Sequence, residues 1–501
     1  MRRRGPLAGS YAAAVALVIC ALVPFLMLTA AVLPLLPLLS KSLGLSKSAL
    51  DVTAGLSDAG YAFGTVLAVQ FAVHLPRRRM LLGYVITFVV AAVLAAWAPS
   101  GAVFAAAFVI EGLCTSLMLI AAVPPLVIGW PTAKMPWTAS IMNLCVFGAV
   151  AVGPTIGGLQ AATGTWRPLF WVVAGVGVVA LAFVLLTFED EPPADRSAPW
   201  DFVALGLAGF GCAAAFFGAA QLEASGPGPA SLTPLLVGIA MICALVVHQY
   251  HSRHPLMPVR QIATTLPVVG LVIVMFASSA AFGLMELVLT SLQGGSPARI
   301  ALEFLPEFGA AVVTAALFGA LFRTRFTPVL AVCGLVVLTA AAALLTGLAT
   351  GGGALVAVGS ALIGFGVGAS VSPALFIVGF SLRSAQIQRV FALVELLRGV
   401  TAFLIAPILL YLATVIGASR AEGTKAAIWI CLGIAAVGGI TAIAVFALGS
   451  RGLQTPNLER WNEGELAWDS PRLFARLRGG RPPAHAAGSA RRQAHDPAEG
   501  T

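Results

Sequence analysis

The chain has 501 residues, of which 59% are hydrophobic and only 10% are charged, and its formal net charge at pH 7 is +9. A soluble globular domain has about 25% charged residues. No water-soluble fold of this length could bury so much apolar surface, so the composition excludes a soluble protein. Because lipid offers the backbone no hydrogen-bond partners, the long apolar runs must be helices. We expect an all-α integral membrane protein.

Apolar runs recur along the chain, and each is close to or longer than the roughly 20 residues that a helix needs to cross a bilayer. Polar breaks at 189–200 and 248–265 divide these runs into groups of six, two and six, and a basic loop follows the second helix of each six-helix group. Such matching halves are typical of secondary transporters. The fourteen predicted spans lie near residues 11–39, 51–73, 80–98, 101–129, 137–162, 168–188, 201–221, 231–250, 266–292, 301–322, 327–348, 354–380, 388–413 and 425–449.

The distribution of basic residues predicts the orientation of the chain. Most of the 29 Lys and Arg residues fall on the side of the N-terminus, which by the positive-inside rule puts both termini in the cytoplasm of a cell-membrane protein. This asymmetry explains the net charge, so we expect no nucleic-acid partner. The predicted parts are a cytoplasmic N-terminus (1–10), an N-terminal six-helix bundle (11–188), a linker with two inserted helices (189–265), a C-terminal six-helix bundle (266–449) and a cytoplasmic, partly disordered tail (450–501).

The run AVAVGPTIGGL contains small residues at helical spacing. Ala149, Gly153 and Gly157 recur every fourth residue and form one smooth face, which Gly158 widens, and Pro154 bends the helix. Membrane helices attract one another by close backbone approach at such faces. The face is therefore either a permanent helix contact or a surface that slides against a partner helix during transport.

The segment GPTIGG, followed by LQAATGTWRPLFWV, resembles the fifth-helix signature of drug:proton antiporters in the major facilitator superfamily. The resemblance covers roughly residues 20–450: EGLCTSLMLIAA is similar to the family's fourth helix, PWDFVALGLAGFG to its seventh, SPARIALEFLP to its tenth and VELLRG to its thirteenth. The resemblance implies two six-helix bundles that rock around a central cavity, and export of small hydrophobic compounds in exchange for protons.

Several positions depart from the family pattern. In the loop between helices two and three, Gln70, His74 and Arg77 stand where the family has glycine, aspartate and glycine. Phe108 replaces the family's fourth-helix arginine, and Leu28 replaces an aspartate of the first helix. Proton coupling, if present, must therefore use other residues. The predicted cytoplasmic gating loop consists of His74, Arg77, Arg78 and Arg79.

Ionisable groups inside the predicted spans are candidates for proton coupling or substrate binding, because each costs at least ~2.5 kcal/mol to insert. We interpret Asp51, in SALD, as a helix cap instead. Glu111 has the alternative of a protonated acid held by a backbone carbonyl, and Glu395 could simply neutralise Arg398 three residues later. The candidates are Asp58, Glu111, Glu286, Glu303, Glu307, Glu395 and Arg398.

The tenth helix carries the predicted proton site. Arg299 is spaced to pair with Glu303, which leaves Glu307 alone, and we expect both acids to share protons with Glu286 as a coupled set. Glu307 is then the last to lose its proton. The alternative is that both acids face the outer vestibule and only attract cations.

No cofactor or metal is expected. His248, His251 and His254 have a spacing that a metal could use, but on an interfacial loop they are more often solvated, and no phosphate-binding loop or catalytic motif indicates ATP use or an enzyme. We expect a monomeric, proton-coupled exporter of small hydrophobic, cationic compounds whose partners are substrate, protons and lipid. Two alternatives remain open: a transporter of a lipid, siderophore or metabolite, and a non-transporting sensor or assembly platform.

Overall fold

The computed structural model describes residues 6–187, 198–348, 352–449 and 452–475. Most of the predicted break at 189–200 and the end of the predicted disordered tail lie outside these residues. The described residues contain fourteen helices that are long and apolar enough to cross a membrane. The predicted all-α membrane fold with fourteen spans is confirmed.

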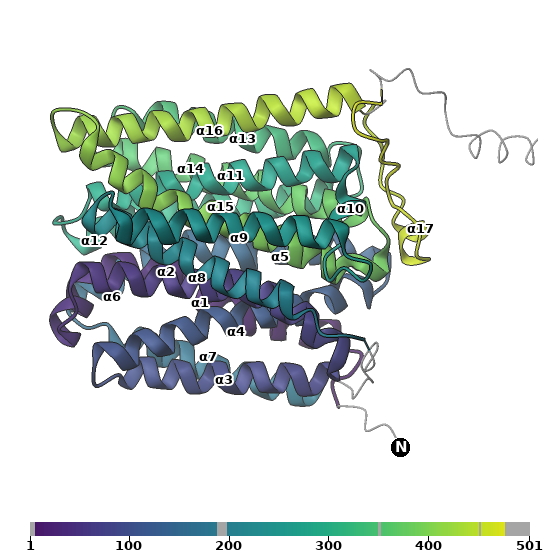
Figure 1. Ribbon diagram of the computed structural model, residues 1–501, viewed down its shortest axis with the longest axis horizontal. Helices are drawn as coiled ribbons and strands as arrows, with labels where there is room; N and C mark the ends of the chain where they lie inside the picture. The colour runs from purple at the N-terminus through teal and green to yellow at the C-terminus, as the bar shows by residue number, and fades with distance from the viewer. Residues whose placement is uncertain (1–5, 188–197, 349–351, 450–451, 476–501) are drawn as a thin grey trace, which may run out of the picture.

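Helices α1 to α7, which we call the first bundle, form the purple and blue half of the molecule (Figure 1). The side chains of Ser10, Ser46 and Ser100 accept hydrogen bonds from first-turn N–H groups and so begin α1, α2 and α4. Such caps satisfy donors that a helix start leaves unpaired. The bounds are α1 (Tyr11–Leu43), α2 (Lys47–His74), α3 (Arg77–Trp97), α4 (Gly101–Ile128), α5 (Met135–Asn143), the π-helical turn η2 (Leu144–Gly148), α6 (Ala149–Ala162) and α7 (Arg167–Thr187).

Helices α11 to α16 form the second bundle, coloured green to yellow (Figure 1). Pro306, Pro373 and Pro407 lie inside α12, α14 and α15, which nevertheless continue past them. Membrane helices tolerate such prolines because neighbouring groups satisfy the freed carbonyls. The bounds are α11 (Thr265–Ser291), α12 (Pro297–Leu321), α13 (Thr327–Leu345), α14 (Gly353–Phe380), α15 (Ile387–Val415) and α16 (Arg420–Gly449).

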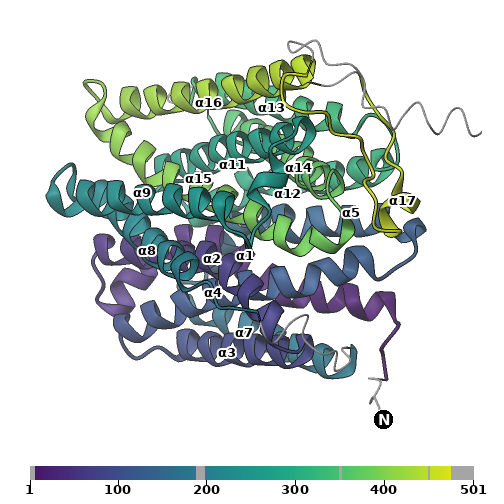
Figure 2. The ribbon, with the colours of Figure 1, turned by 45° about the vertical axis from the view of Figure 1, so that its right-hand side comes forward.

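The inserted helices, α8 (Phe202–Ser225) and α9 (Pro229–His251), lie at the level of the seam between the bundles in both views (Figures 1 and 2). Helix α8 packs on α2 of the first bundle and on α15 of the second, whereas α9 packs chiefly on α8. Helix α8 therefore covers one side of the seam between the bundles, and α9 lies outside it.

The seam itself is held chiefly by α12, which packs against α5 and α6, and by α2, which packs against α15. A polar link crosses it at the π-helical turn, where the Asn143 amide donates to the Gly368 carbonyl (3.1 Å) and accepts from the Ser372 hydroxyl (3.0 Å). Pi-helical turns are rare and frequently occur at functional sites. The bundles are thus joined by a few specific contacts.

The described part of the tail packs on the bundle. Trp461, in the short helix α17 (Leu458–Asn462), is fully buried and donates to the Leu382 carbonyl over 2.9 Å, and the Ala467 N–H donates to the Phe380 carbonyl over 3.0 Å. We call this end of the molecule, which also holds the start of α1, the terminal end, and the opposite end the far end (Figure 1).

Candidate functional site

A cavity of about 120 Å³ lies between the bundles in the half of the molecule nearer the far end. Helices α1, α2 and α4 of the first bundle, α11 and α15 of the second, and the inserted α8 supply its walls. Its size leaves room for several water molecules. The cavity is therefore a place where both bundles and the inserted helix can contact one ligand.

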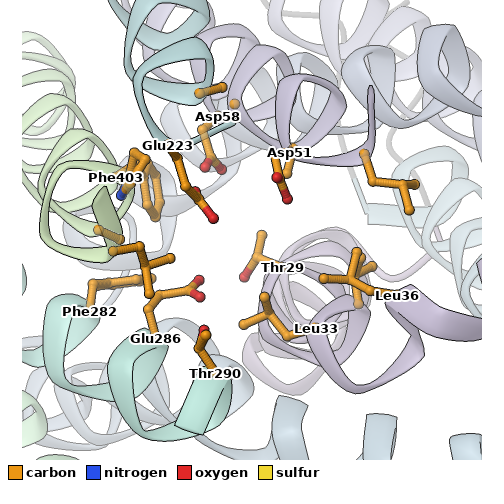
Figure 3. Close-up of a pocket in the computed structure, with 18 of the residues that line it drawn as sticks. Thr29, Leu33, Leu36, Asp51, Asp58, Glu223, Phe282, Glu286, Thr290 and Phe403 are labelled. Atoms are coloured by element: carbon orange, nitrogen blue, oxygen red, sulfur yellow. The ribbon is translucent and has the colours of Figure 1, made fainter. Parts of the chain in front are cut away.

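Four carboxylates line this cavity and point into one common space (Figure 3). Asp51 and Asp58 come from α2, Glu223 from α8 and Glu286 from α11. Lys47 is the only base among the described residues that line the cavity, and its ammonium lies 3.3 Å from a Glu223 oxygen. Because acids outnumber bases four to one, the cavity attracts cations and protons.

Two of the four acids, Asp58 and Glu286, are predicted candidates, and the structure brings them together from opposite bundles. The other two are not. The seventh span was predicted to end at residue 221, but α8 continues to Ser225 and so includes Glu223. The interpretation of Asp51 as a helix cap is wrong, because Ser46 caps α2 and Asp51 lies a turn inside it.

Aromatic rings form much of the remaining wall. Phe282 and Phe403 meet edge to face with 5.0 Å between their centroids, and Phe216 comes from the inserted helix. Phe108, which stands where the family has an arginine, lines the same cavity. Aromatic faces attract cations as well as apolar groups. This wall suits a ligand that is both hydrophobic and positively charged.

Arg398 and Glu395 form a second charged site behind the aromatic wall. The Arg398 guanidinium donates to a Glu395 oxygen over 2.6 Å, and the Tyr61 hydroxyl donates to the same oxygen over 3.2 Å. Glu395 and Arg398 are 3% and 2% exposed. Tyr61 belongs to the first bundle and the other two to the second, so the cluster joins the bundles in a dry environment.

The acids of the tenth predicted helix, Glu303 and Glu307, lie apart from the acid-lined cavity between the bundles. Arg299 pairs with Glu303 over 2.6 Å, as its spacing predicts. Glu307 is buried, one of its oxygens has no hydrogen-bond partner among the described residues, and it lines a separate cavity of about 20 Å³. Glu286 instead lines the larger cavity with the other acids. The predicted coupled set of Glu286, Glu303 and Glu307 is therefore not assembled.

Phe282 and Met285 of α11 line both cavities, so their side chains separate Glu307 from the acid-lined space. The smaller cavity is large enough for about one water molecule.

Glu111, on α4, is fully buried, and neither of its oxygens has a partner among the described residues. An unpaired carboxylate charge is costly in such surroundings.

The glycine-rich face of α6 divides between two partners. A side chain at Gly153 would meet the Met27 carbonyl of α1 at 2.6 Å, and one at Gly157 would meet the Ala31 backbone of the same helix. Gly158 instead faces the Pro297 carbonyl of α12, at 2.7 Å from the position of a Cβ atom. Ala149 and Pro154 are buried in the same helix. The predicted smooth face is thus a contact within the first bundle, and its Gly158 edge is a contact between bundles.

His74 of the predicted gating loop, together with Gln70, contacts the residues at the start of the inserted helix α8. One ring nitrogen of His74 lies 2.8 Å from the Ala198 carbonyl, the ring stacks on Trp200 at 4.5 Å, and the Gln70 side chain accepts from the Asp201 N–H over 3.2 Å. The departures from the family pattern at Gln70 and His74 therefore coincide with the docking of α8. Of the three arginines, Arg77 begins α3 and lines a cavity of about 480 Å³ at the terminal end, Arg78 donates to the Leu185 carbonyl, and Arg79 follows in α3.

His248 of the HxxHxxH motif lies 3.0 Å from an Asp201 oxygen, and a His251 ring nitrogen lies 3.0 Å from the Val247 carbonyl. In the described part of the chain, no three His, Cys, Asp or Glu side chains are grouped so that they could hold a metal ion. Asp201 also caps α8 by accepting from the Ala204 N–H. His248 therefore takes part in anchoring the two inserted helices to each other.

Relatives support a transporter. The multidrug resistance protein Stp of Mycobacterium tuberculosis (strain CDC 1551 / Oshkosh) is 25% identical over 348 residues, covering 68% of this chain and 64% of that protein. The lincomycin resistance protein LmrB of Bacillus subtilis (strain 168) is 25% identical over 205 residues, 40% and 43% of the two chains. The tetracenomycin C resistance and export protein of Streptomyces glaucescens is 25% identical over 224 residues, 44% and 41%. The chain thus matches less than two thirds of the length of each.

The fold is shared with a solved structure, that of the human organic anion transporter MFSD10 (TETRAN), with a TM-score of 0.60. The two chains are 15% identical, and the match covers 86% of this chain and 99% of the other, so it establishes the fold alone. A family model described as Major Facilitator Superfamily matches residues 17–376, well over half of the chain. The chain therefore belongs to the major facilitator superfamily, and its fourteen helices fit the fourteen-helix drug:proton antiporter family.

Proposed function

We propose that this transporter exports small hydrophobic cations in exchange for protons, with both termini in the cytoplasm. The observation that carries the proposal is the cavity between the bundles, which gathers four carboxylates and four phenylalanine rings around a single lysine. The relatives named for multidrug resistance or antibiotic export support the coarser part of the proposal, the export of small drug-like compounds.

Charge favours a cation over a neutral or anionic substrate. Burial of an anion beside Asp58 and Glu286 would add like charges in poorly hydrated surroundings, where electrostatic repulsion is much stronger than in water. A cation gains the reverse interaction, and the rings of Phe282 and Phe403 add cation–π attraction of about 0.5–2 kcal/mol. The cavity thus selects on charge and on apolar surface together.

Competition for the same carboxylates provides the coupling. A substrate cation and a proton cannot both neutralise one carboxylate, so protonation of Asp58 or Glu286 weakens the hold on the substrate, and substrate binding displaces the proton. Because Asp58 belongs to the first bundle and Glu286 to the second, neutralisation of the pair also removes repulsion between the bundles. Occupancy of the cavity is thereby linked to the approach of the two bundles.

The contacts along the seam supply the axis of movement. Gly158 lets the backbone of α6 meet α12, and the Thr155 hydroxyl donates to the Ala301 carbonyl over 3.1 Å. A bulky residue could not pass such a close backbone contact, whereas glycine leaves a smooth surface. We propose that α6 and α12 rock against each other here while the α1–α6 contact stays fixed.

Proteoliposomes with an imposed pH gradient test the function. We expect the parent protein to drive accumulation of a hydrophobic cation such as tetraphenylphosphonium, and the substrate to accelerate proton flux. Glu286→Gln should lower the coupled fluxes roughly 30- to 100-fold. Glu422→Gln serves as a matched control, because Glu422 lies at the far end, outside the cavity, and caps the Ala418 N–H.

Three outcomes would reject the proposal. Transport of the cation without proton movement would leave a uniporter or another coupling ion, and binding without any transport would favour the sensor or platform. Transport of a neutral lipid or an anion at the expense of cations would indicate a different substrate class.

A further inference from the structure

The inserted helix α8 ends at the acid-lined cavity with Glu223, and the start of α2 covers that residue with Lys47. The pair is asymmetric: the Glu223 side chain is 14% exposed and the Lys47 side chain 62% exposed. The carboxylate is therefore part of the cavity wall, while the ammonium approaches it from the solvent side at the end of a flexible stem.

Helix α8 packs on α2 at several levels, and these contacts hold Glu223 near Lys47. At the terminal end of α8, Gln70 accepts from the Asp201 N–H over 3.2 Å. In the middle, Gly55 allows α2 to lie against the backbone of Phe216, with 3.2 Å between the carbonyl oxygen and the position of a Cβ atom. Both members of the ion pair thus lie on helices that pack directly on each other.

Lys47 also lies one helical turn before Asp51 on α2, and both line the cavity. Side chains four residues apart on a helix are neighbours. A single ammonium is therefore positioned above two of the four cavity carboxylates. It is the one positive group among the described residues that line the cavity.

We propose that Lys47 is an internal counter-cation of the empty transporter, and that Glu223 passes from Lys47 to the substrate's positive group when the substrate binds. This inference rests on the proposed cation-binding function. An ion pair with one exposed partner is weak and is screened by salt, so a cation that also buries apolar surface can displace the ammonium. The inserted helix then supplies Glu223 as a specificity-determining residue. Lys47 competes for Glu223, so a substrate cation must bind more strongly than the ammonium to replace it.

The test is equilibrium binding of tetraphenylphosphonium to the purified full-length protein in lipid nanodiscs at low ionic strength. We expect Lys47→Gln to bind the cation several-fold more tightly than the parent, because the competing charge is gone. Glu223→Gln should bind it more weakly. In the double variant the gain from Lys47→Gln should disappear, and in the Lys47→Gln single variant it should shrink at high salt.

Lys41→Gln is the matched control, since Lys41 is an exposed lysine near the same end of the molecule, on α1, and does not line the cavity. It should leave the affinity unchanged. Unchanged or weaker binding by Lys47→Gln would overturn the inference, as would a gain that persists when Glu223 is glutamine. If the parent and all variants fail to bind the cation, the proposed function fails as well, which separates the two conclusions. Thermal stability of each variant, measured in parallel, shows whether it is folded.

Discussion

Two groups of buried charges lie at the seam between the bundles and differ in how they are satisfied. Arg398, Glu395 and Tyr61 satisfy one another in a dry site behind Phe403. The acids Asp58 and Glu286 share an open cavity in which a single lysine is paired with another residue. The same residue type thus stabilises a contact where its partner is built in, and remains available to a ligand where it is not.

The difference follows from the cost of burial. Removing one member of a buried ion pair leaves an uncompensated charge, which is expensive, whereas replacing both members is often tolerated. An acid in the open cavity has no built-in partner to lose. Neutralisation should therefore damage stability at the first group and transport at the second.

The largest effect is expected at the paired group. Arg398→Ala should destabilise the protein by about 3–5 kcal/mol, because Glu395 is left as a buried, unpaired charge. Thermal unfolding followed by size-exclusion chromatography would detect the loss. Glu395→Leu combined with Arg398→Leu should recover much of the stability. If Arg398→Ala melts at the parent's temperature, the Arg398–Glu395 pair does not contribute to stability.

Neutralising the cavity acids should have the opposite signature. In Asp58→Asn or Glu286→Gln, we expect pH-driven export to fall roughly 30- to 100-fold, the equivalent of one lost hydrogen bond to a charged group of about 2–3 kcal/mol. The melting temperature should stay the same or rise, since no partner is orphaned. Export and unfolding measured on one preparation check both parts. A variant with a lowered melting temperature and unchanged export would contradict the prediction, because the acid would then serve stability and not transport.

Glu307 tests a third environment, buried and unpartnered in a small separate cavity. Glu307→Gln keeps the volume but cannot release a proton. We expect accumulation against the gradient to fall by about tenfold, or ~1.4 kcal/mol, while downhill exchange of substrate continues. Counterflow and uphill uptake compared in the same vesicles separate the two. Uphill pumping at the parent's rate would remove Glu307 from the proton path, and Asp58 would then be the stronger candidate.

The smallest effect is expected from the hydroxyl that completes the paired group. Tyr61→Phe removes one hydrogen bond to Glu395 but leaves the ion pair, so stability should fall by about 1 kcal/mol. Thermal unfolding beside Arg398→Ala gives the ratio of the two effects. An equal loss in both variants would mean that the Tyr61 hydrogen bond stabilises the site as much as the Arg398 charge does.

Local patterns predicted much of the molecule. The spans depend on the length of each apolar run, and the pairs Glu395–Arg398 and Arg299–Glu303 depend on helical spacing. Each of these features is contained in a single helix. Sequence patterns describe such features because the geometry of one helix is nearly constant.

The sequence did not show which residues line the cavity together. Glu223 was missed because an acid near the end of an apolar run reads as the end of the span, and Asp51 because an acid early in a helix also suits a cap. Glu286 was assigned to the wrong neighbours, since adjacent helices in sequence need not face each other. Gln70 and His74 depart from the family pattern, and this was a signal for the place where α8 docks. Their contacts with the start of α8 became clear only with the fold.

By itself, the sequence determined a fourteen-helix membrane protein, an excess of buried acids and a smooth face on α6. The tertiary structure alone decided that Asp51, Asp58, Glu223 and Glu286 share one cavity while Glu307 lies in another. The physical reason is that lipid is as apolar as the helices, so hydrophobic patterns do not specify lateral neighbours. Close packing of small residues and a few polar contacts choose them, and these depend on residues far apart in the chain.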